Sequence, residues 1–440
     1  MQEQFNFTWF MATGAAHIFE CDNEKLGNRM PRARISLIKN LGNDSKLSQS
    51  AETGLKRVNP FMLFLGIYVA YNIVGLINTP WTIRGAYDKG LCWQLFITGL
   101  SGFLLALLFC RRGGRKVVSS VSRQRTSRQL TVFFFSIFVV CLALTILMSG
   151  GIPLFMGEDR FGNSALAFNL IQFYGFWILV RMISAMECNK RIGLIQPIVY
   201  VIGVLCFGYR TPVLVFFLVI FVYQIVFRMP RGRALLFGLV SIFVIIGFAA
   251  IFAAYRVSQS YDLITFFGNI DFRYMSDHRY LWPFVPALAM LDFSQSTVSS
   301  IGSALHQYMY GGLFLSNYET FLPGKHWGAR NIIGDITSAR WVSGRPMSIT
   351  PTLQGALYVD FGYIGVFAGF FIISAGIGIL WRRAKRWGAL GKFGFCYIFA
   401  LSIMSIHNGY WDAGFVFFLI FVGIILGFDF IRLRIAGIER

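Results

Sequence analysis

Apolar residues in this chain fall into long uninterrupted blocks and do not alternate with polar residues. Each block is roughly 20 residues long, the length that a helix needs to cross the hydrocarbon layer of a membrane. The pattern therefore predicts an all-α polytopic integral membrane protein with about ten transmembrane helices. The blocks cover residues 60–78, 90–110, 130–148, 164–186, 192–208, 212–227, 234–254, 357–380, 393–408 and 412–430.

Short basic runs follow every second block, at residues 111–128, 190–191, 228–233 and 382–392 and after residue 431. Cytoplasmic loops of membrane proteins are enriched in Lys and Arg, so the alternation predicts that both termini are cytoplasmic. The expected organisation is a cytoplasmic extension, seven helices, one large extracytoplasmic loop, three helices and a cytoplasmic tail. Their boundaries are 1–59, 60–254, 255–356, 357–431 and 432–440.

The composition agrees with this pattern. Apolar residues make up 56% of the chain and charged residues only 14%, against roughly 25% charged residues in soluble domains. The net charge of +20 is typical of nucleic-acid binders when it occurs in a soluble protein. Here the basic residues lie between apolar blocks, so the bilayer is the predicted partner and nucleic acid is not.

The long loop 255–356 is the feature most typical of function, because loops of this length in compact proteins usually carry it. Its two apolar patches, 281–293 and 301–315, are too short to span and predict interfacial helices against the outer leaflet. The loop is also rich in cationic and imidazole side chains. They are Arg256, Arg273, His278, Arg279, His306, His326, Arg330, Arg340 and Arg345.

Two short outer connections also present arginines. Arg160 follows a Gly- and Pro-containing run that starts at Ser149, and Arg210 lies in the tight turn 207–212 between predicted helices five and six. Guanidinium groups stay charged and bind phosphate oxygens in a bidentate way, so outward arginines that converge suit a lipid-linked diphosphate. Arg84 and Arg330 are individually more typical of headgroup anchors.

Other kinds of chemistry find little support in the sequence. The predicted span centres carry almost no ionisable residues, which argues against a proton relay through the bilayer. Nucleotide-binding and zinc-hydrolase motifs are absent from the sequence, and we predict no cofactor and no metal. The pair Glu158 and Asp159 is more typical of charge balance than of a metal site. His407 and Asn408, with Asp412, form a turn polar enough to line a cavity.

Several short motifs, taken in order, resemble the oligosaccharide repeat-unit polymerases of the O-antigen polymerase type. They are the runs 322–335, 348–352 and 357–365, the Gly-Gly-Ile-Pro-Leu-Phe run that leads to Arg160, and the turn Gly208-Tyr-Arg210. The resemblance covers roughly residues 60–430 and includes the number of spans and the place of the long loop. The first 50 residues have no counterpart.

The resemblance implies a multi-pass glycosyltransferase of the cell membrane with its active site on the outer face. Such enzymes transfer a growing glycan from polyprenyl diphosphate to a newly arrived lipid-linked repeat unit, and a partner that sets chain length is implied by analogy alone. We assign Arg210 and Arg160 to the leaving diphosphate and expect Arg256 and Arg345 to assist them. The expected substrate-binding residues are Arg273, Arg279, Glu319, Tyr358 and Asp360.

A general base would help the acceptor hydroxyl, and His306, Glu319 and Asp335 remain equal candidates for it. Two other functions remain as alternatives, and the sequence barely separates the first of them from a polymerase. A ligase would share the donor and the fold and would transfer the finished glycan to a lipid or a protein. A flippase would need polar residues along its whole transit path, whereas the polar residues here concentrate at the predicted outer side.

Overall fold

The computed structural model describes residues 58–77, 88–111, 128–155, 165–230, 285–320, 328–338, 348–384, 387–412 and 414–435, with scattered positions between 232 and 278. All of them lie in one compact unit, Arg57–Arg440. The regular structure of these residues is helical, with no strand, which confirms the predicted all-α class.

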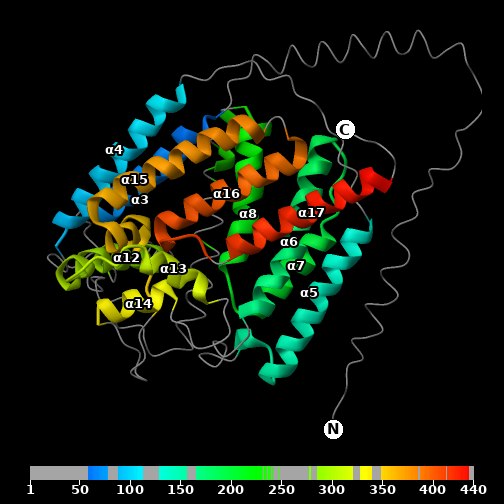
Figure 1. Ribbon diagram of the computed structural model, residues 1–440, viewed down its shortest axis with the longest axis horizontal. Helices are drawn as coiled ribbons and strands as arrows, with labels where there is room; N and C mark the ends of the chain where they lie inside the picture. Colours follow the sequence, from blue (N-terminus) through cyan, green and yellow to red (C-terminus); the bar gives the residue numbers. More distant parts are fainter. Residues whose placement is uncertain are drawn as a thin grey trace, which may run out of the picture. The chain divides into compact units, whose positions relative to one another are not determined.

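Most of the described helices coincide with the predicted apolar blocks. Figure 1 shows their arrangement. Their bounds are α3 Pro60–Leu76, α4 Gly90–Arg111, α5 Arg128–Ser149, η1 Pro153–Phe155, α6 Ala165–Glu187, α7 Ile195–Cys206, α8 Thr211–Tyr223, the π-helix η3 Gln224–Arg228, α12 Val285–Ala304, α13 Gly312–Glu319, α14 Ala329–Ile336, α15 Thr352–Ala384, α16 Gly388–Asn408 and α17 Gly414–Ile435.

Six of the described helical stretches are long and apolar enough to cross a membrane: Gly90–Cys110, Arg128–Phe155, Leu166–Glu187, Thr211–Arg228, Thr352–Ala384 and Gly388–Asn408. Three further predicted spans coincide with shorter apolar helices, Pro60–Leu76, Ile195–Cys206 and Gly414–Phe428. The block 234–254 lies largely outside the described residues. The chain is a multi-pass membrane protein, and ten spans and cytoplasmic termini remain predictions.

The helices of the long loop differ from the two short ones that we expected. One helix of 20 residues, α12, begins inside the first apolar patch and continues across the polar stretch 294–300. Ser294 and Gln295 are fully buried there, because that face of α12 packs against α3, α4 and α15. Thr297 is nearly as buried and donates to the carbonyl of Phe293 at 2.8 Å within the helix. Polar residues that looked like a break in the pattern are therefore part of a buried helix face.

The basic connectors that are described meet at one end of the helix bundle. Lys392, near the start of α16, forms an ion pair with Glu187 at the end of α6. Arg228, at the end of η3, donates to Asn189 at 2.8 Å. The connections after α6, after η3 and before α16 thus lie together, as the alternation of basic runs requires. We call this the basic end of the bundle.

The opposite end depends on a break in α15. At Gly362 the backbone takes φ 64° and ψ −153°, a combination essentially restricted to glycine. The carbonyls of Val359 and Asp360, just before the break, accept hydrogen bonds from the N–H groups of Met309 and Tyr310 at 3.0 and 2.9 Å. The break therefore lets the segment before α13 attach directly to α15.

We expect Gly362→Ala to lower the free energy of unfolding by at least about 1–3 kcal/mol, since an alanine is strained in this conformation. A Cβ there would also lie 2.9 Å from the ring of Tyr308. Thermal unfolding in detergent measures the change. The matched control is Gly376→Ala in the same helix, where a Cβ meets nothing within 4 Å. Equal melting temperatures for the two variants would contradict the prediction.

Candidate functional site

A cavity of about 240 Å³ opens at the end of the bundle opposite the basic end. Residues of α6, α7, α8 and α16 form its inner part, which we call the floor. Residues of α13, of α14 and of the turn between α16 and α17 surround its opening, which we call the mouth. The volume is below the roughly 300–1,000 Å³ typical of sites for whole drug-sized ligands. The cavity therefore has room for one part of a large substrate.

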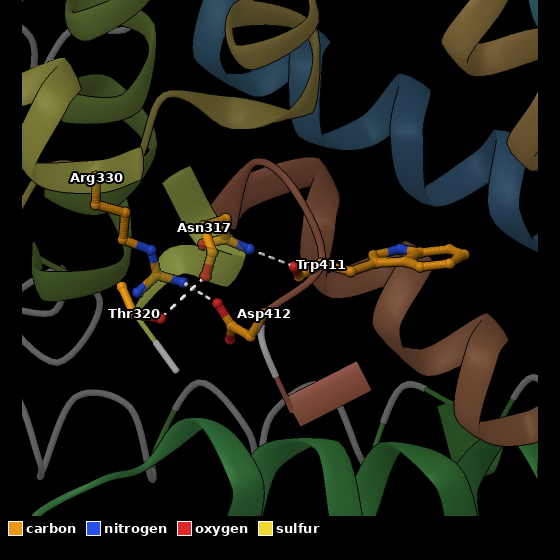
Figure 2. A network of polar contacts seen from close by, with 5 residues as sticks. All are labelled: Asn317, Thr320, Arg330, Trp411 and Asp412. Carbon is orange, nitrogen blue, oxygen red and sulfur yellow. Dashed lines mark hydrogen bonds and ion pairs between the residues drawn. The ribbon is translucent and has the colours of Figure 1, made fainter. Parts of the chain in front are cut away.

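An arginine and a carboxylate face each other at the mouth (Figure 2). Arg330, at the second position of α14, lies 3.2 Å from Asp412 in the turn before α17. Their side chains remain 31% and 47% exposed, respectively, so an incoming anion can reach the guanidinium. Beside them, Asn317 donates to the carbonyl of Trp411, and Thr320 donates to the carbonyl of Asn317 at 3.0 Å.

A second arginine lies beside residues that line the cavity. Arg210 occupies the N-cap position of α8, and its neighbours Tyr209 and Thr211 both line the cavity. Arg210 and Arg330 both lie near enough to His407 to interact electrostatically with its ring. Residues about 120 positions apart in the chain therefore place two positive charges around one end of α16.

His407 links this region to the other side of α16. Its Nδ1 lies 2.9 Å from the hydroxyl of Tyr71 on α3 and 3.1 Å from the hydroxyl of Ser294 on α12. Both hydroxyls are able to donate, and a neutral ring that accepts at Nδ1 carries its proton on Nε2. The histidine therefore connects α3 and α12 to the helix that forms part of the cavity.

Asp360 anchors the wall that carries Asn317 and Thr320. It is fully buried and accepts backbone N–H bonds from Gly311, Leu313 and Phe314 in the first turn of α13, at 2.9 to 3.2 Å. The hydroxyl of Tyr410 also donates to it, at 2.7 Å. A carboxylate is favourable at a helix N-terminus, where unpaired N–H groups carry partial positive charge. Burial, followed by this carboxylate, raises the pKa of Tyr410, which keeps the phenol a donor.

None of the described residues to which the sequence assigned a catalytic or substrate-binding role is among those that line the cavity. Arg210 lies between Tyr209 and Thr211, which both line it. His306 is exposed in the turn after α12, Glu319 is exposed at the end of α13, and Asp335 is exposed near the end of α14. Tyr358 stacks edge-on against Tyr308, at 5.8 Å between ring centres, and does not line the cavity.

The contacts of Asp360 are those of a helix cap, so its predicted sugar binding stays a prediction. The remaining predicted residues lie outside the described part of the chain, and their roles also stay predictions. They are Arg160, Arg256, Arg273, Arg279 and Arg345.

Sequence reasoning undervalued Arg330, which we took for a headgroup anchor, and it missed the amides Asn169 and Gln172 on α6. The run 322–335 had drawn attention to Arg330 only as part of a motif. The two amides are spaced three positions apart in an apolar block, which puts them on one face of a helix, and this signal was available.

Within the described residues, no group of three or more His, Cys, Asp or Glu side chains is placed to hold a metal ion.

Comparisons with known proteins add one family and one relative. The family model described as "Putative O-antigen polymerase" matches residues 57–419. The chain is similar to an uncharacterized protein of Methanocaldococcus jannaschii, with 26% identity over 263 residues that cover 59% of this chain and 64% of the relative. The chain thus spans less than two thirds of that relative's length. No solved structure matches the chain.

We expect Asp360→Asn to loosen α13, because the amide sets an NH₂ group against one of the donors that now point at the carboxylate. Loss of such a cap costs about 0.5–2 kcal/mol. Hydrogen exchange of the α13 amides, followed by mass spectrometry, measures the change. Tyr410→Phe, which leaves the three backbone bonds in place, should have the smaller effect. Unchanged protection of α13 in Asp360→Asn would contradict the assignment of Asp360 as an anchor.

Proposed function

The chain belongs to the O-antigen polymerase family, and from this premise we propose that it joins lipid-linked oligosaccharide repeat units into a surface polysaccharide. Membership implies polymerisation of repeat units and a glycosyltransferase-like activity. We propose in addition that the donor is a growing glycan on polyprenyl diphosphate, that the acceptor is a new repeat unit, and that transfer takes place at the mouth of the cavity.

The observation that carries this proposal is the pair Arg330 and Asp412 at the mouth, with Arg210 between two residues that line the cavity, Tyr209 and Thr211. Two guanidinium groups suit a diphosphate, because each presents a planar fork of donors that matches phosphate oxygens. Both arginines lie at the start of a helix, Arg210 at the N-cap of α8 and Arg330 at the second position of α14. Donors carried by regular elements need less rearrangement than donors on loops when a charge forms beside them.

In the proposed step, a hydroxyl oxygen of the new repeat unit attacks the anomeric carbon of the growing glycan. The bond from that carbon to the diphosphate oxygen breaks, and its electron pair stays on the diphosphate. The hydroxyl proton passes to a carboxylate. Charge grows on the leaving diphosphate during the step, so Arg210 and Arg330 stabilise the transition state more than the bound donor.

We assign the role of general base to Asp412, in place of the three candidates from the sequence. Among the described residues that line the cavity, Asp412 is the one carboxylate, and it lies beside the arginine that would hold the leaving group. His306, Glu319 and Asp335 are not among the lining residues. A base has to lie within hydrogen-bond reach of the proton that it removes, which favours Asp412.

The proposed reaction requires the mouth to face the outside of the cell. Cys188, which is exposed beside the basic end, should then react with a membrane-impermeant maleimide only after the membrane is opened. Gln307→Cys lies at an exposed position before α13. In a background that lacks Cys188 and also Cys21 of the predicted cytoplasmic extension (Cys21→Ser, Cys188→Ser), this variant should react in intact cells. The opposite result, with Cys188 labelled in intact cells and the Gln307→Cys variant labelled only after the membrane is opened, would reverse the proposed orientation.

We expect Arg330→Ala to slow chain elongation by about 100-fold or more, the usual cost of removing one preorganised donor from a developing oxyanion. Arg330→Lys should recover little of it, because an ammonium cannot form the bidentate contact. Purified protein in lipid vesicles with diphosphate-linked repeat units, and products resolved by size, measures the rate. The matched control is Arg228→Lys at the basic end, which should elongate at the wild-type rate.

The same assay separates the proposal from its alternatives. A ladder of products with added repeat units in the wild type supports a polymerase. Glycan that appears only on an added foreign acceptor would make the protein a ligase. Lipid-linked glycan that crosses the bilayer with no new bond formed would make it a flippase and overturn the proposed reaction.

A further inference from the structure

Arg181 is a charged residue inside a candidate membrane span. It lies on α6, in the stretch Leu166–Glu187 and close to its end, roughly 9 Å before Glu187 at 1.5 Å per residue. An ionisable side chain within a span is costly, and it usually marks a site or has a partner of opposite charge. The proposed reaction gives Arg181 no role, because the residue lies toward the basic end and the cavity opens at the other end.

The partner of Arg181 is neutral. Its Nη1 donates to Oε1 of Gln196, at the second position of α7, at 2.8 Å. The amide engages one of the five N–H donors of the guanidinium and leaves its charge uncompensated. Glu187, the nearest carboxylate along the chain, is held by Lys392 and by the hydroxyl of Tyr223 instead. No described carboxylate forms an ion pair with Arg181, so the guanidinium can bind an anion from outside the protein.

Such an anion can reach Arg181 from the side of the bundle. The residue is partly exposed, and α7, which begins beside it, has only 12 residues. A helix of this length measures roughly 18 Å, whereas the hydrocarbon layer is about 30 Å thick. Because Gln196 bonds to Arg181, α7 begins inside the thickness that α6 spans. A guanidinium so near the end of a span extends toward the headgroups, and a lipid phosphate can approach it beside the first turn of α7.

The exposed face of α7 adds an apolar surface next to Arg181. Ile195, Ile198 and Ile202 are 63%, 53% and 56% exposed, and their spacing places them on one stripe of the helix. The opposite face of α7, with Tyr200 and Val204, is buried. The stripe starts next to Gln196 and follows α7 away from the basic end. It matches an acyl chain that runs along α7 from a phosphate at Arg181.

The connection between α6 and α7 carries further positive charge. Lys190 and Arg191 lie in it, and both are exposed. Arg228 joins the same connection through its hydrogen bond to Asn189 at 2.8 Å. Each basic side chain near a membrane surface attracts anionic lipid. The surroundings of Arg181 therefore favour a headgroup with net negative charge over a zwitterionic one.

We propose that Arg181 and Gln196 form a binding site for an anionic phospholipid of the leaflet at the basic end. The guanidinium binds the phosphate, the amide holds the guanidinium in place, and an acyl chain follows the isoleucine stripe of α7. The site goes beyond the proposed function, because it uses none of the residues assigned to the reaction. A bound lipid joins α6 to α7, two helices that also line the cavity.

The test measures lipid binding by native mass spectrometry of the full chain in detergent. The probes are dioleoyl phosphatidylglycerol, dioleoyl phosphatidylcholine and glycerol phosphate, which has no acyl chains. The wild type should bind the first phosphatidylglycerol at least about fivefold more tightly than the first phosphatidylcholine, the preference expected from one basic side chain near the headgroup. Arg181→Gln should lose most of this preference, because it removes the charge and keeps an amide that can bond to Gln196.

Gln196→Glu is the second variant, because it places a carboxylate beside Arg181. It keeps the contact between α6 and α7 and compensates the charge of the guanidinium, so it should also lose the preference. The matched control is Arg383→Gln in the last turn of α15, an exposed position just before α16. It removes the same charge elsewhere and should keep the preference. A loss in Arg181→Gln and Gln196→Glu alone supports the site.

Equal affinity of the wild type for the two lipids would overturn the site. An equal loss of preference in Arg383→Gln would also do so, because the overall charge of the basic end would then explain the binding. An unchanged preference in Gln196→Glu would limit Arg181 to a contact between two helices. Glycerol phosphate that binds as tightly as phosphatidylglycerol would replace the lipid by a soluble phosphate. These outcomes leave the proposed function unaffected, since elongation is measured separately.

Discussion

One buried carboxylate holds together the elements around the cavity. Asp360 lies immediately before the break in α15, accepts three backbone N–H groups from the start of α13 and receives the hydroxyl of Tyr410 from the turn after α16. A buried charge is tolerated only where it is fully hydrogen-bonded. The requirement to satisfy Asp360 thus fixes α13 relative to α15 and α16, and with it the side of the cavity mouth that carries Asn317.

The break in α15 follows from the same requirement. A continuous helix would use the carbonyls of Val359 and Asp360 internally, whereas the break at Gly362 frees them for the segment before α13. Irregular backbone at membrane depth is tolerated where protein buries it or a cavity adjoins it. A single glycine therefore makes room for an irregular segment that a regular span would exclude.

Positive charge and neutral polarity are separated along the cavity. Arg330 and Asp412 lie at the mouth, where both remain partly exposed, and the amides of Asn169 and Gln172 lie buried deeper in the cavity lining, where a bare charge would be expensive. The separation suits a substrate whose charged group stays at the mouth. The proposed polymerase chemistry rests on this charged end of the cavity.

The sequence alone determined what depends on local patterns. Apolar blocks of membrane length predicted the described helices outside the long loop, with bounds right to within a few residues, because each span has to satisfy its own backbone. The turn that carries Arg210 was recognised from its Gly and Pro neighbours. Only the tertiary structure decided which polar residues meet. Arg330 and Asp412 are 82 positions apart. No periodicity in the sequence indicates that the two segments that carry them come together. Asp360 is ambiguous for the same reason, since a carboxylate that caps a helix and one that binds a sugar have the same pattern in the sequence and differ only in what the fold places beside them.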